Sequence, residues 1–562
     1  MTFQVNQIDA YNTMNEIILH YAELHSKERI FIGSSKGVVG YTDKRILQLA
    51  NQVHSALKKL NIKKDDRVLI ILQTSIEYVS SFFGTLLAGG IVVPLASQNI
   101  GANNLGYYLE RIQHIIQNCN PKCIILDEIQ FKPLEEMLDQ FSHINVVNVN
   151  KLENSPEIPE YIIPDGDDIC FIQYTSGSTG TPKGVPITHR NLISNIDSIT
   201  RASLITEKDS CVSWLPLYHD MGLIGGFFVP FVRGIPLVLF PPELFIFKPF
   251  LWLKFLSDYK GTLGLGNNFA LKYTMKRIKD EELKLLDLSS WRVAYNGSEP
   301  INMDVINDFY DKFKNAGYRA EAMFPCYGLA EATLAVTFPS PTEKPHSVRF
   351  SRDSIYEGQV VKVTTGYEKN SIELVAVGSP VPNMRVKIVD SDGSELEDGW
   401  VGEIIINGPS VMSGYFNHSS SEKEEYLKND WFYTGDLGFF YENELFIAGR
   451  KKELIIIRGK NYSPVDIEKT IMDQLHNKIS SCIAFGYMNP ERKEEVLAIV
   501  YEAKKQDEGF VKEIKETIKR IVSNEFGIGV EDVIGTLKIP KTLNGKPMRS
   551  ECYSKYILGQ VL

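Results

Sequence analysis

Short apolar runs alternate with longer amphipathic stretches in the first part of the chain, and this alternation is the strongest constraint on its fold. Residues 67–72 form an apolar run typical of a strand that is covered on both faces. After it, helical and extended patterns follow one another over residues 76–87, 91–94, 105–118 and 123–126. This order predicts an α/β fold with a parallel sheet.

The length and composition indicate a large globular protein. With 562 residues the chain is too long for one hydrophobic core, so we expect several domains. Its residues are 43% hydrophobic and 23% charged, which is ordinary for globular proteins. The formal net charge of −10 argues against nucleic acid as a main partner. Seven scattered cysteines and the lack of a signal-like N-terminus indicate reduced thiols and predict a cytoplasmic location.

One stretch, residues 79–96, has the length of a membrane span and contains no charged residue. It is interrupted by Gly89, Gly90 and Pro94, and serines and a threonine break its apolar character. We interpret it as a buried helix followed by a strand, and we expect no membrane span.

A glycine-rich loop carries the clearest chemical signal. Residues 175–184 read Thr-Ser-Gly-Ser-Thr-Gly-Thr-Pro-Lys-Gly, after an apolar strand over 169–174 and before a helix that starts at 188–192. Glycines let backbone N–H groups approach a ligand, and with hydroxyls and a lysine they form a concave site for a polyphosphate. The loop is not a Walker A motif, because Pro182 stands where that motif needs its second glycine. The alternative is a flexible linker, which seldom separates a buried strand from a helix.

Three further strands run into polar turns. The first precedes Tyr-His-Asp at 218–220 and a long apolar run, the second ends at 295–300, and the third leads into 327–333. Ligands of open α/β sheets bind outside the carboxyl ends of the strands, so we expect these turns to meet there. Taken alone, His219 is interpreted as a structural histidine, and the apolar run that follows it is interpreted as part of the hydrophobic core.

The C-terminal region has a different pattern. Helices are expected at 464–475 and 510–526, and strands at 479–486 and 495–501. This indicates a compact α+β domain of about 110 residues, which is within the usual range.

The motifs together resemble the adenylate-forming superfamily, which includes acyl-CoA synthetases, luciferases and nonribosomal adenylation domains. The resemblance runs from about residue 30 to the end. It rests on TSGSTGTPKG at 175–184, YGLAEA at 327–332, YTGD at 433–436, GRKKELIIIRG at 449–459 and PKTLNGK at 540–546.

Within that superfamily the chain is most similar to the fatty acyl-AMP ligases. The similarity lies in WLPLYHDMGL at 214–223, YNGSEPI at 295–301, YGLAEATLA at 327–335, RGKNYSPVDIE at 458–468, and an extra segment between Phe338 and Val377. The resemblance implies a large domain over 1–451 with an insertion at about 340–376, and a small mobile domain over 452–562. In this family the insertion is thought to restrain the small domain and to disfavour CoA chemistry.

The resemblance also implies site residues for ATP and its metal ion. The phosphates would be bound by Thr175, Ser176, Gly177, Ser178, Thr179, Gly180 and Lys183. Mg²⁺ would be held by Glu331 with Thr175, although a carboxylate at a helix start more commonly serves the helix dipole. The nucleoside would be bound by Ser298, Glu299, Tyr327, Gly328, Asp436 and Arg450, with Tyr327 stacking on adenine and both free oxygens of Asp436 accepting from the ribose.

The remaining implied roles concern the acid and the moving domain. Lys546 would contact the acyl carboxylate and the α-phosphate, and His219 would lie beside that carboxylate. Lys452 would be the hinge for the small domain. The acyl chain would enter the apolar run, where the expected pocket residues are Met221, Gly225, Gly226 and Phe227.

These expectations predict a fatty acid adenylase that uses ATP and Mg²⁺. It would make acyl-AMP and pyrophosphate from a medium- or long-chain acid, then pass the acyl group to the phosphopantetheine thiol of a separate acyl carrier protein. A conventional fatty acyl-CoA synthetase is the main alternative. An amino acid adenylase lacks support, because no Asp stands early in 214–218 to hold an amino group. A non-catalytic homologue is disfavoured because Lys183, Glu331, Asp436 and Lys546 are all intact.

Overall fold

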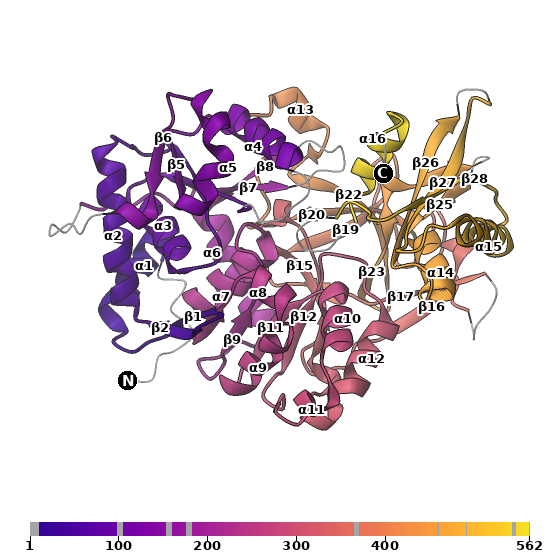
Figure 1. Cartoon of the computed structure of the whole chain (residues 1–562), viewed down its shortest axis with the longest axis horizontal. Coiled ribbons are helices and arrows are strands. Elements are labelled where there is room, and N and C mark those ends of the chain that lie inside the picture. Colours follow the sequence, from indigo (N-terminus) through magenta and orange to yellow (C-terminus); the bar gives the residue numbers. More distant parts are fainter. Residues whose placement is uncertain are drawn as a thin grey trace.

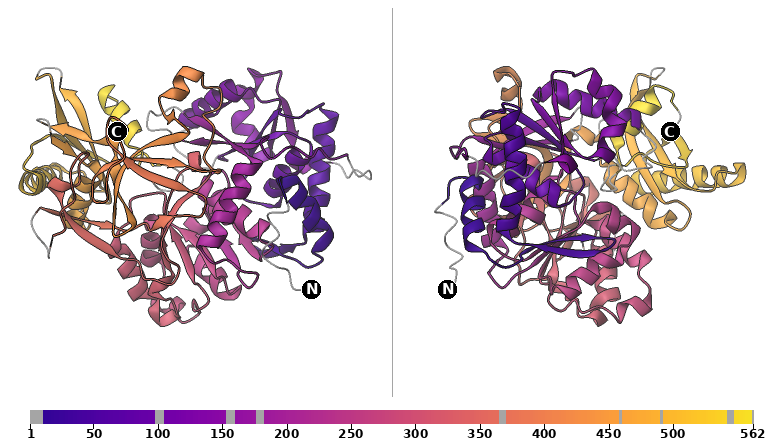
Figure 2. Two further views of the ribbon diagram at one scale, coloured as in Figure 1. Left: turned by 180° about the vertical axis from the view of Figure 1, so that it is seen from behind. Right: turned by 60° about the vertical axis from the view of Figure 1, so that its left-hand side comes forward.

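The computed structural model describes residues 11–97, 105–152, 160–175, 182–364, 370–457, 460–489, 492–541 and 547–560. It has two large sheets flanked by helices, a third region of antiparallel strands, and a C-terminal region that lies at one side of the molecule (Figure 1). The views in Figure 2 show this C-terminal region, in yellow and light orange, standing apart from the first 100 residues.

The first sheet has six strands and confirms the predicted alternation. Its order is β6 (Asn145–Asn148), β5 (Cys123–Leu126), β3 (Arg67–Ile71), β4 (Ile91–Leu95), β7 (Ile169–Thr175) and β8 (Lys183–Thr188). The first five strands are parallel and β8 is antiparallel to β7. The helices before and between these strands are α1 (Met14–Leu24), α2 (Asp43–Lys59), α3 (Ile76–Leu87), α4 (Leu105–Cys119) and α5 (Glu128–Asp139).

The uncharged stretch 79–96 consists of most of α3 and the strand β4, as predicted. Ser75 caps α3 by accepting from the backbone N–H of Tyr78. Gly84 lets α3 approach α2 closely, since a Cβ at this position would lie 2.5 Å from the carbonyl oxygen of Ala50. Within the described residues, no helix is both long enough and apolar enough to span a membrane.

The second sheet has seven strands and carries the three motif turns. Its order is β13 (Met323–Pro325), β12 (Val293–Asn296), β11 (Leu263–Gly266), β9 (Cys211–Ser213), β10 (Leu237–Leu239), β1 (Ile30–Ser34) and β2 (Gly37–Tyr41). All neighbours are parallel except β1 and β2. Its helices are α6 (His189–Ala202), α7 (Val229–Val232), α8 (Pro242–Phe247), α9 (Phe250–Asp258), α10 (Asn268–Arg277), α11 (Asp280–Leu283) and α12 (Met303–Phe313).

Antiparallel strands follow these two sheets. One sheet contains β19 (Arg385–Val389), β20 (Gly402–Asn407), β21 (Leu427–Lys428), β22 (Trp431–Tyr441) and β23 (Glu444–Arg450), and another contains β14 (Tyr327–Gly328), β15 (Ala335–Phe338) and β18 (Ser379–Pro380). The short helix α13 (Ser420–Glu424) precedes β21. The segment predicted as an insertion contains the hairpin β16 (Ser347–Ser351) and β17 (Ser371–Val375). Its Phe350 packs edge-on against Phe439 and Phe446 of the neighbouring sheet.

The C-terminal region has its own hydrophobic clusters. Its elements are β24 (Ile455–Ile457), β25 (Lys460–Tyr462), α14 (Pro464–Leu475), β26 (Ser481–Asn489), β27 (Glu494–Glu502), α15 (Glu508–Phe526), β28 (Val530–Thr536) and α16 (Arg549–Ile557). The predicted helices and strands of this region are confirmed, and β28 adds a strand parallel to β27 that we had not predicted.

Two local expectations about the motifs differ from the structure. The glycine-rich loop joins two antiparallel strands, because β8 pairs with β7 before α6 begins at His189. The expected helix start at Glu331 is only a three-residue 3₁₀ turn, Ala330–Ala332. It ends at Thr333, whose φ of +70° cannot continue a helix.

Candidate active site

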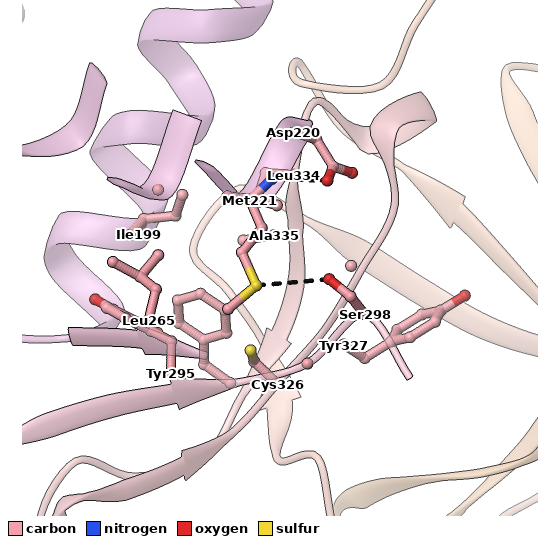
Figure 3. Close-up of a pocket in the computed structure, with 14 residues that line it drawn as sticks. Ile199, Asp220, Met221, Leu265, Tyr295, Ser298, Cys326, Tyr327, Leu334 and Ala335 are labelled. Atoms are coloured by element: carbon pink, nitrogen blue, oxygen red, sulfur yellow. Dashed lines mark hydrogen bonds between the residues drawn. The ribbon is translucent and has the colours of Figure 1, made fainter. Parts of the chain in front are cut away.

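A pocket lies where the turns after β9, β12 and β13 meet, at the carboxyl edge of the seven-stranded sheet (Figure 3). It encloses about 470 Å³ of space, part of which is open to solvent. The lining side chains are Ile199, Asp220, Met221, Gly225, Leu265, Tyr295, Gly297, Ser298, Cys326, Tyr327, Gly328, Leu334, Ala335 and Phe338. The predicted convergence of the three turns is therefore confirmed.

The two ends of this pocket differ in character. Figure 3 shows Ile199 and Leu265 at one end and Ser298 and Tyr327 at the other. Between them lies the thioether of Met221, whose Sδ is 3.5 Å from the hydroxyl of Ser298. The pocket can therefore take an apolar group at one end and a polar group at the other.

The four expected acyl-pocket residues fall on two faces of one helix. They belong to the π-helix η3 (Met221–Phe228), where Met221 and Gly225 line the pocket. Gly226 faces the core, since a Cβ there would lie 2.4 Å from the hydroxyl of Ser213. Phe227 is fully buried and packs against other phenylalanine rings. Helical periodicity places residues four apart on the same side, so the expectation for Gly226 and Phe227 does not agree with their placement.

His219 lies beside the pocket and is paired with its neighbour. Its Nδ1 is 2.7 Å from Oδ1 of Asp220, which also accepts from the backbone N–H of Met221. Burial opposes ionisation of Asp220, but His219 and the backbone N–H of Met221 together hold the pKa of this carboxyl below its ordinary value. Asp220 lines the pocket, whereas His219 is not among the lining residues. We had not predicted a role for Asp220, and its only signal in the sequence is its place next to His219.

Three predicted nucleoside residues form one hydrogen-bonded group. The hydroxyl of Tyr327 donates to Oδ2 of Asp436 at 2.7 Å, and Nε of Arg450 donates to Oδ1 at 3.0 Å. Burial and the charge of Asp436 raise the pKa of Tyr327, which keeps its hydroxyl protonated as a donor. We expected both oxygens of Asp436 to be free for a ribose. Each already accepts one hydrogen bond, although an ionised carboxylate can accept more.

The predicted turns at Ser298 and Gly328 shape the backbone. Ser298 has a φ of +69°, and a Cβ at Gly328 would lie 2.0 Å from the carbonyl oxygen of Leu334, so only glycine fits there. The side chain of Glu299 points to a helix, since Oε1 accepts from the backbone N–H of Phe269 at the start of α10. Glu299 therefore stabilises that helix N-terminus.

The two ends of the glycine-rich loop lie opposite each other, because Thr175 and Lys183 are partners in the β7–β8 ladder. The ammonium of Lys183 lies 4.9 Å from the centre of the Tyr415 ring. The predicted phosphate-binding residues Ser176, Gly177, Ser178, Thr179 and Gly180 lie outside the described residues, and so does Lys546.

Glu331 is held by a residue that the motifs did not indicate. The hydroxyl of Tyr415 donates to Oε1 of Glu331 at 2.6 Å. Burial raises the pKa of Glu331, and this hydrogen bond partly opposes the effect. Tyr415 was missed because a tyrosine in a Ser-Gly-Tyr turn carries no local sign of a partner 84 residues away.

The described residues contain no cluster of three or more His, Cys, Asp or Glu side chains that could hold a metal ion. Magnesium ions that arrive with a nucleotide need fewer protein ligands, since they keep water and phosphate oxygens in their shell. The hydroxyl of Tyr415 donates to Oε1 of Glu331, and an ionised carboxylate has two oxygens, so the other can serve such an ion. The residues present therefore fit a metal bound together with ATP.

Lys452 is exposed in the 3₁₀ turn η8 (Lys451–Glu453), which follows β23. Its neighbour Lys451 pairs with Glu357 of the insertion at 2.8 Å and with Glu403 at 3.3 Å. The predicted hinge position thus lies where the insertion, β20 and the C-terminal region meet.

Comparisons with known proteins bear on the family of this chain. The family model described as AMP-binding enzyme matches residues 20–416. The chain is 31% identical over 559 residues to the medium-chain-fatty-acid–acyl-carrier-protein ligase JamA of Moorena producens, covering 96% of this chain and 94% of the relative. It is 32% identical over 520 residues to the long-chain-fatty-acid–AMP ligase FadD26 of Mycobacterium marinum, covering 87% of each chain.

Solved structures show the same relationship. A chain from a study of fatty acyl-adenylate ligases of E. coli and L. pneumophila superposes with a TM-score of 0.90 at 28% identity, covering 100% of this chain and 99% of that chain. The fatty acyl-adenylate ligase of L. pneumophila in complex with acyl adenylate and pyrophosphate has a TM-score of 0.75 at 31% identity, covering 98% and 97%. This chain therefore belongs to the AMP-binding enzymes, in their fatty acyl-AMP ligase group.

Proposed function

We propose that this enzyme activates a medium- or long-chain fatty acid with ATP, forming acyl-AMP and pyrophosphate. The observation that carries the proposal is the pocket with one apolar end, whose polar end reaches the group formed by Tyr327, Asp436 and Arg450. The apolar end presents side chains suited to contact an acyl chain, and the polar end presents groups suited to a ribose and phosphate.

In the first half-reaction an oxygen of the fatty acid carboxylate attacks the α-phosphorus of ATP, and the bond to the β-phosphate oxygen breaks. The chain can contribute little covalent chemistry to such a step, so its residues position the groups and neutralise developing charge. Asp436, Tyr327 and Arg450 would orient the nucleoside. Lys183 and the glycine-rich loop would hold the leaving pyrophosphate, and Lys546 would neutralise charge at the reacting centre.

A magnesium ion would be held by Glu331 with the hydroxyl of Thr175 and would neutralise charge on the phosphates. The apolar end of the pocket would bind the acyl chain through the hydrophobic effect. Each buried methylene contributes about 0.8 kcal/mol, so a chain of about ten carbons gains several kcal/mol and selection by length becomes possible.

We also propose that the acyl group then passes to an acyl carrier protein. In this step the phosphopantetheine thiol attacks the acyl carbonyl, a thioester forms and AMP leaves. The carrier-protein ligase JamA, similar over 96% of this chain, supports this acceptor. The insertion also supports it, since Arg352 joins the insertion to α14 and α15 and could limit the movement needed for CoA.

The test is a mass-spectrometric assay of acyl-AMP over a series of chain lengths, with ATP and either CoA or a holo-carrier protein. We expect acyl-AMP with fatty acids and transfer to the carrier. Efficient formation of acyl-CoA would contradict the proposed acceptor. Pyrophosphate exchange that responds to an amino acid and not to a fatty acid would contradict the proposed substrate.

The lysine of the C-terminal region offers a sharper test. In Lys546→Ala we expect adenylation to fall by about 10²- to 10³-fold, because a charge-stabilising group at the transition state is lost, while ATP binding is retained. The matched control is Lys541→Ala, whose side chain pairs with Glu502 and should leave the rate near that of the wild type. Unchanged acyl-AMP formation in Lys546→Ala would show that this lysine has another role.

A further inference from the structure

Tyr415 contacts the two charged residues proposed to handle phosphates and metal. Its hydroxyl donates to Oε1 of Glu331 at 2.6 Å, and its ring faces the ammonium of Lys183 at 4.9 Å. One side chain thus touches a cation from β8 and an anion from the turn after β14. The two charged residues are 148 positions apart in the chain, and Tyr415 links them from a third segment.

The segment around Tyr415 is tied to the same two elements through its backbone. The N–H of Met412 donates to the carbonyl oxygen of Glu331, and the N–H of Phe416 donates to the carbonyl oxygen of Gly184, each at 2.8 Å. The N–H of Tyr415 itself donates to the hydroxyl of Tyr426, and the two rings pack edge-on. Tyr415 is therefore held in place by groups that are independent of its own two side-chain contacts.

A tyrosine suits both contacts at once. The negative face of its ring attracts a cation, and its hydroxyl is a donor that a carboxylate accepts. The hydrogen bond occupies Oε1 of Glu331 and fixes the plane of the carboxylate, which leaves Oε2 in a defined direction. Hydrogen bonds to a carboxylate ligand of this kind orient it for a metal ion.

We propose that Tyr415 is a positioning residue that sets the Glu331 carboxylate and the Lys183 ammonium in place together, so that metal and phosphates bind as a unit. This inference rests on the proposed function, since it assumes that Glu331 and Lys183 act on MgATP. In this proposal Tyr415 acts through Glu331 and Lys183 and makes no contact of its own with the reacting atoms. Its effect is therefore seen first in binding and only then in rate.

The test compares Tyr415→Phe with Tyr415→Leu. Calorimetry measures the affinity for a non-hydrolysable ATP analogue, with Mg²⁺ and without it. In Tyr415→Phe we expect Mg²⁺ to be needed at about 10- to 100-fold higher concentration, with the Mg²⁺-free affinity unchanged. In Tyr415→Leu the Mg²⁺-free affinity should also fall by about 2- to 30-fold, because Lys183 loses its aromatic partner.

Tyr310→Phe is the matched control, since Tyr310 also has a lysine over its ring, Lys314 at 5.8 Å, but lies on α12 away from the pocket. It should leave both affinities unchanged, and unfolding temperatures check that each variant is folded. If Tyr415→Phe needs the same Mg²⁺ concentration as the wild type to bind the ATP analogue, the inference is wrong. It is also wrong if Glu331→Gln needs the same Mg²⁺ concentration as the wild type. Failure of the wild type to form acyl-AMP would instead reject the proposed function, and the binding data would still decide the role of Tyr415.

Discussion

At the scale of single residues, the hydrogen bond between Tyr327 and Asp436 changes the interpretation of the two motifs that contain them. The two residues belong to motifs 109 positions apart, and each was expected to contact the nucleotide independently. In the structure the hydroxyl of Tyr327 orients the carboxylate of Asp436, while Arg450 holds its other oxygen. The proposed nucleoside site is therefore a preorganised group of three side chains.

This arrangement predicts the effect of Tyr327→Phe. The ring remains for stacking, but Asp436 loses a donor, and hydrogen bonds to charged groups contribute about 1.5–3 kcal/mol. We expect the KM for ATP to rise by about 10- to 100-fold and the KM for the fatty acid to stay unchanged, as measured by pyrophosphate release.

Tyr21→Phe serves as the control for Tyr327→Phe. Its hydroxyl donates to the carbonyl oxygen of Val232, away from the pocket. This variant should lower the unfolding temperature and leave the KM for ATP unchanged. An unchanged KM for ATP in Tyr327→Phe would show that the hydrogen bond from Tyr327 is not required to orient the Asp436 carboxylate for ATP binding.

At the scale of elements, the π-helix η3 separates residues that are adjacent in sequence. Gly225 faces the pocket, where a Cβ would lie 3.1 Å from Leu265 and 3.2 Å from Leu334. Gly226 faces Ser213, which is buried. The same substitution at the two glycines should therefore have two different effects.

We predict that Gly225→Ala narrows the pocket and favours shorter acids. The rate of acyl-AMP formation with a longer acid should fall by about 4-fold, relative to a shorter one, for each methylene that no longer fits. The flexible ends of the two leucines can move, so the fold should be retained. Gly226→Ala should instead lower the unfolding temperature without changing the ranking of chain lengths, because the new methyl group meets the core. A chain-length series of acyl-AMP formation and thermal unfolding measure the two effects. Identical chain-length profiles for Gly225→Ala and the wild type would contradict this placement.

At the scale of the whole molecule, the segment predicted as an insertion contacts the C-terminal region. Nε and Nη2 of Arg352, just after β16, donate to the two carboxylate oxygens of Asp466 on α14, at 2.8 and 3.3 Å. The same guanidinium lies 4.9 Å from the ring of Phe526, at the end of α15. Figure 1 shows β16 and β17 beside α14. Both charged side chains are largely buried, at 12% and 7% exposure, so breaking this pair would leave an unpaired buried charge.

We predict that Arg352→Ala frees the C-terminal region. Amide exchange in α14 and α15 should become faster, and acyl-CoA formation should rise relative to the wild type, since CoA chemistry needs the small domain to turn. Hydrogen exchange followed by mass spectrometry and a CoA assay measure these changes.

The matched control is Arg349→Ala, because Arg349 pairs with Glu373 inside the β16–β17 hairpin. It should leave both the exchange rates and the acceptor unchanged. If Arg352→Ala and Arg349→Ala behave alike, the insertion does not restrain the C-terminal region through this pair.

The sequence by itself determined the elements whose residues act locally. The helix at 76–87 and the strand at 123–126 appear where the hydrophobic pattern predicts them. The spacing of apolar residues within such a segment is a local property of the sequence, and it indicates helix or strand without knowledge of distant contacts. The order of the motifs likewise determined the family. The strand β8 was missed because it begins within the glycine-rich loop motif and contains Gly184 and Pro186, two residue types that are depleted in strands.

Only the tertiary structure decided which side chains meet. The contact of Tyr415 with Glu331 and Lys183, and that of Arg352 with Asp466, join segments that are far apart in the chain. The direction of Phe227 into the core depends on the rings packed around it. Such contacts result from packing and charge pairing between elements, and a local pattern contains no information about a partner it does not include.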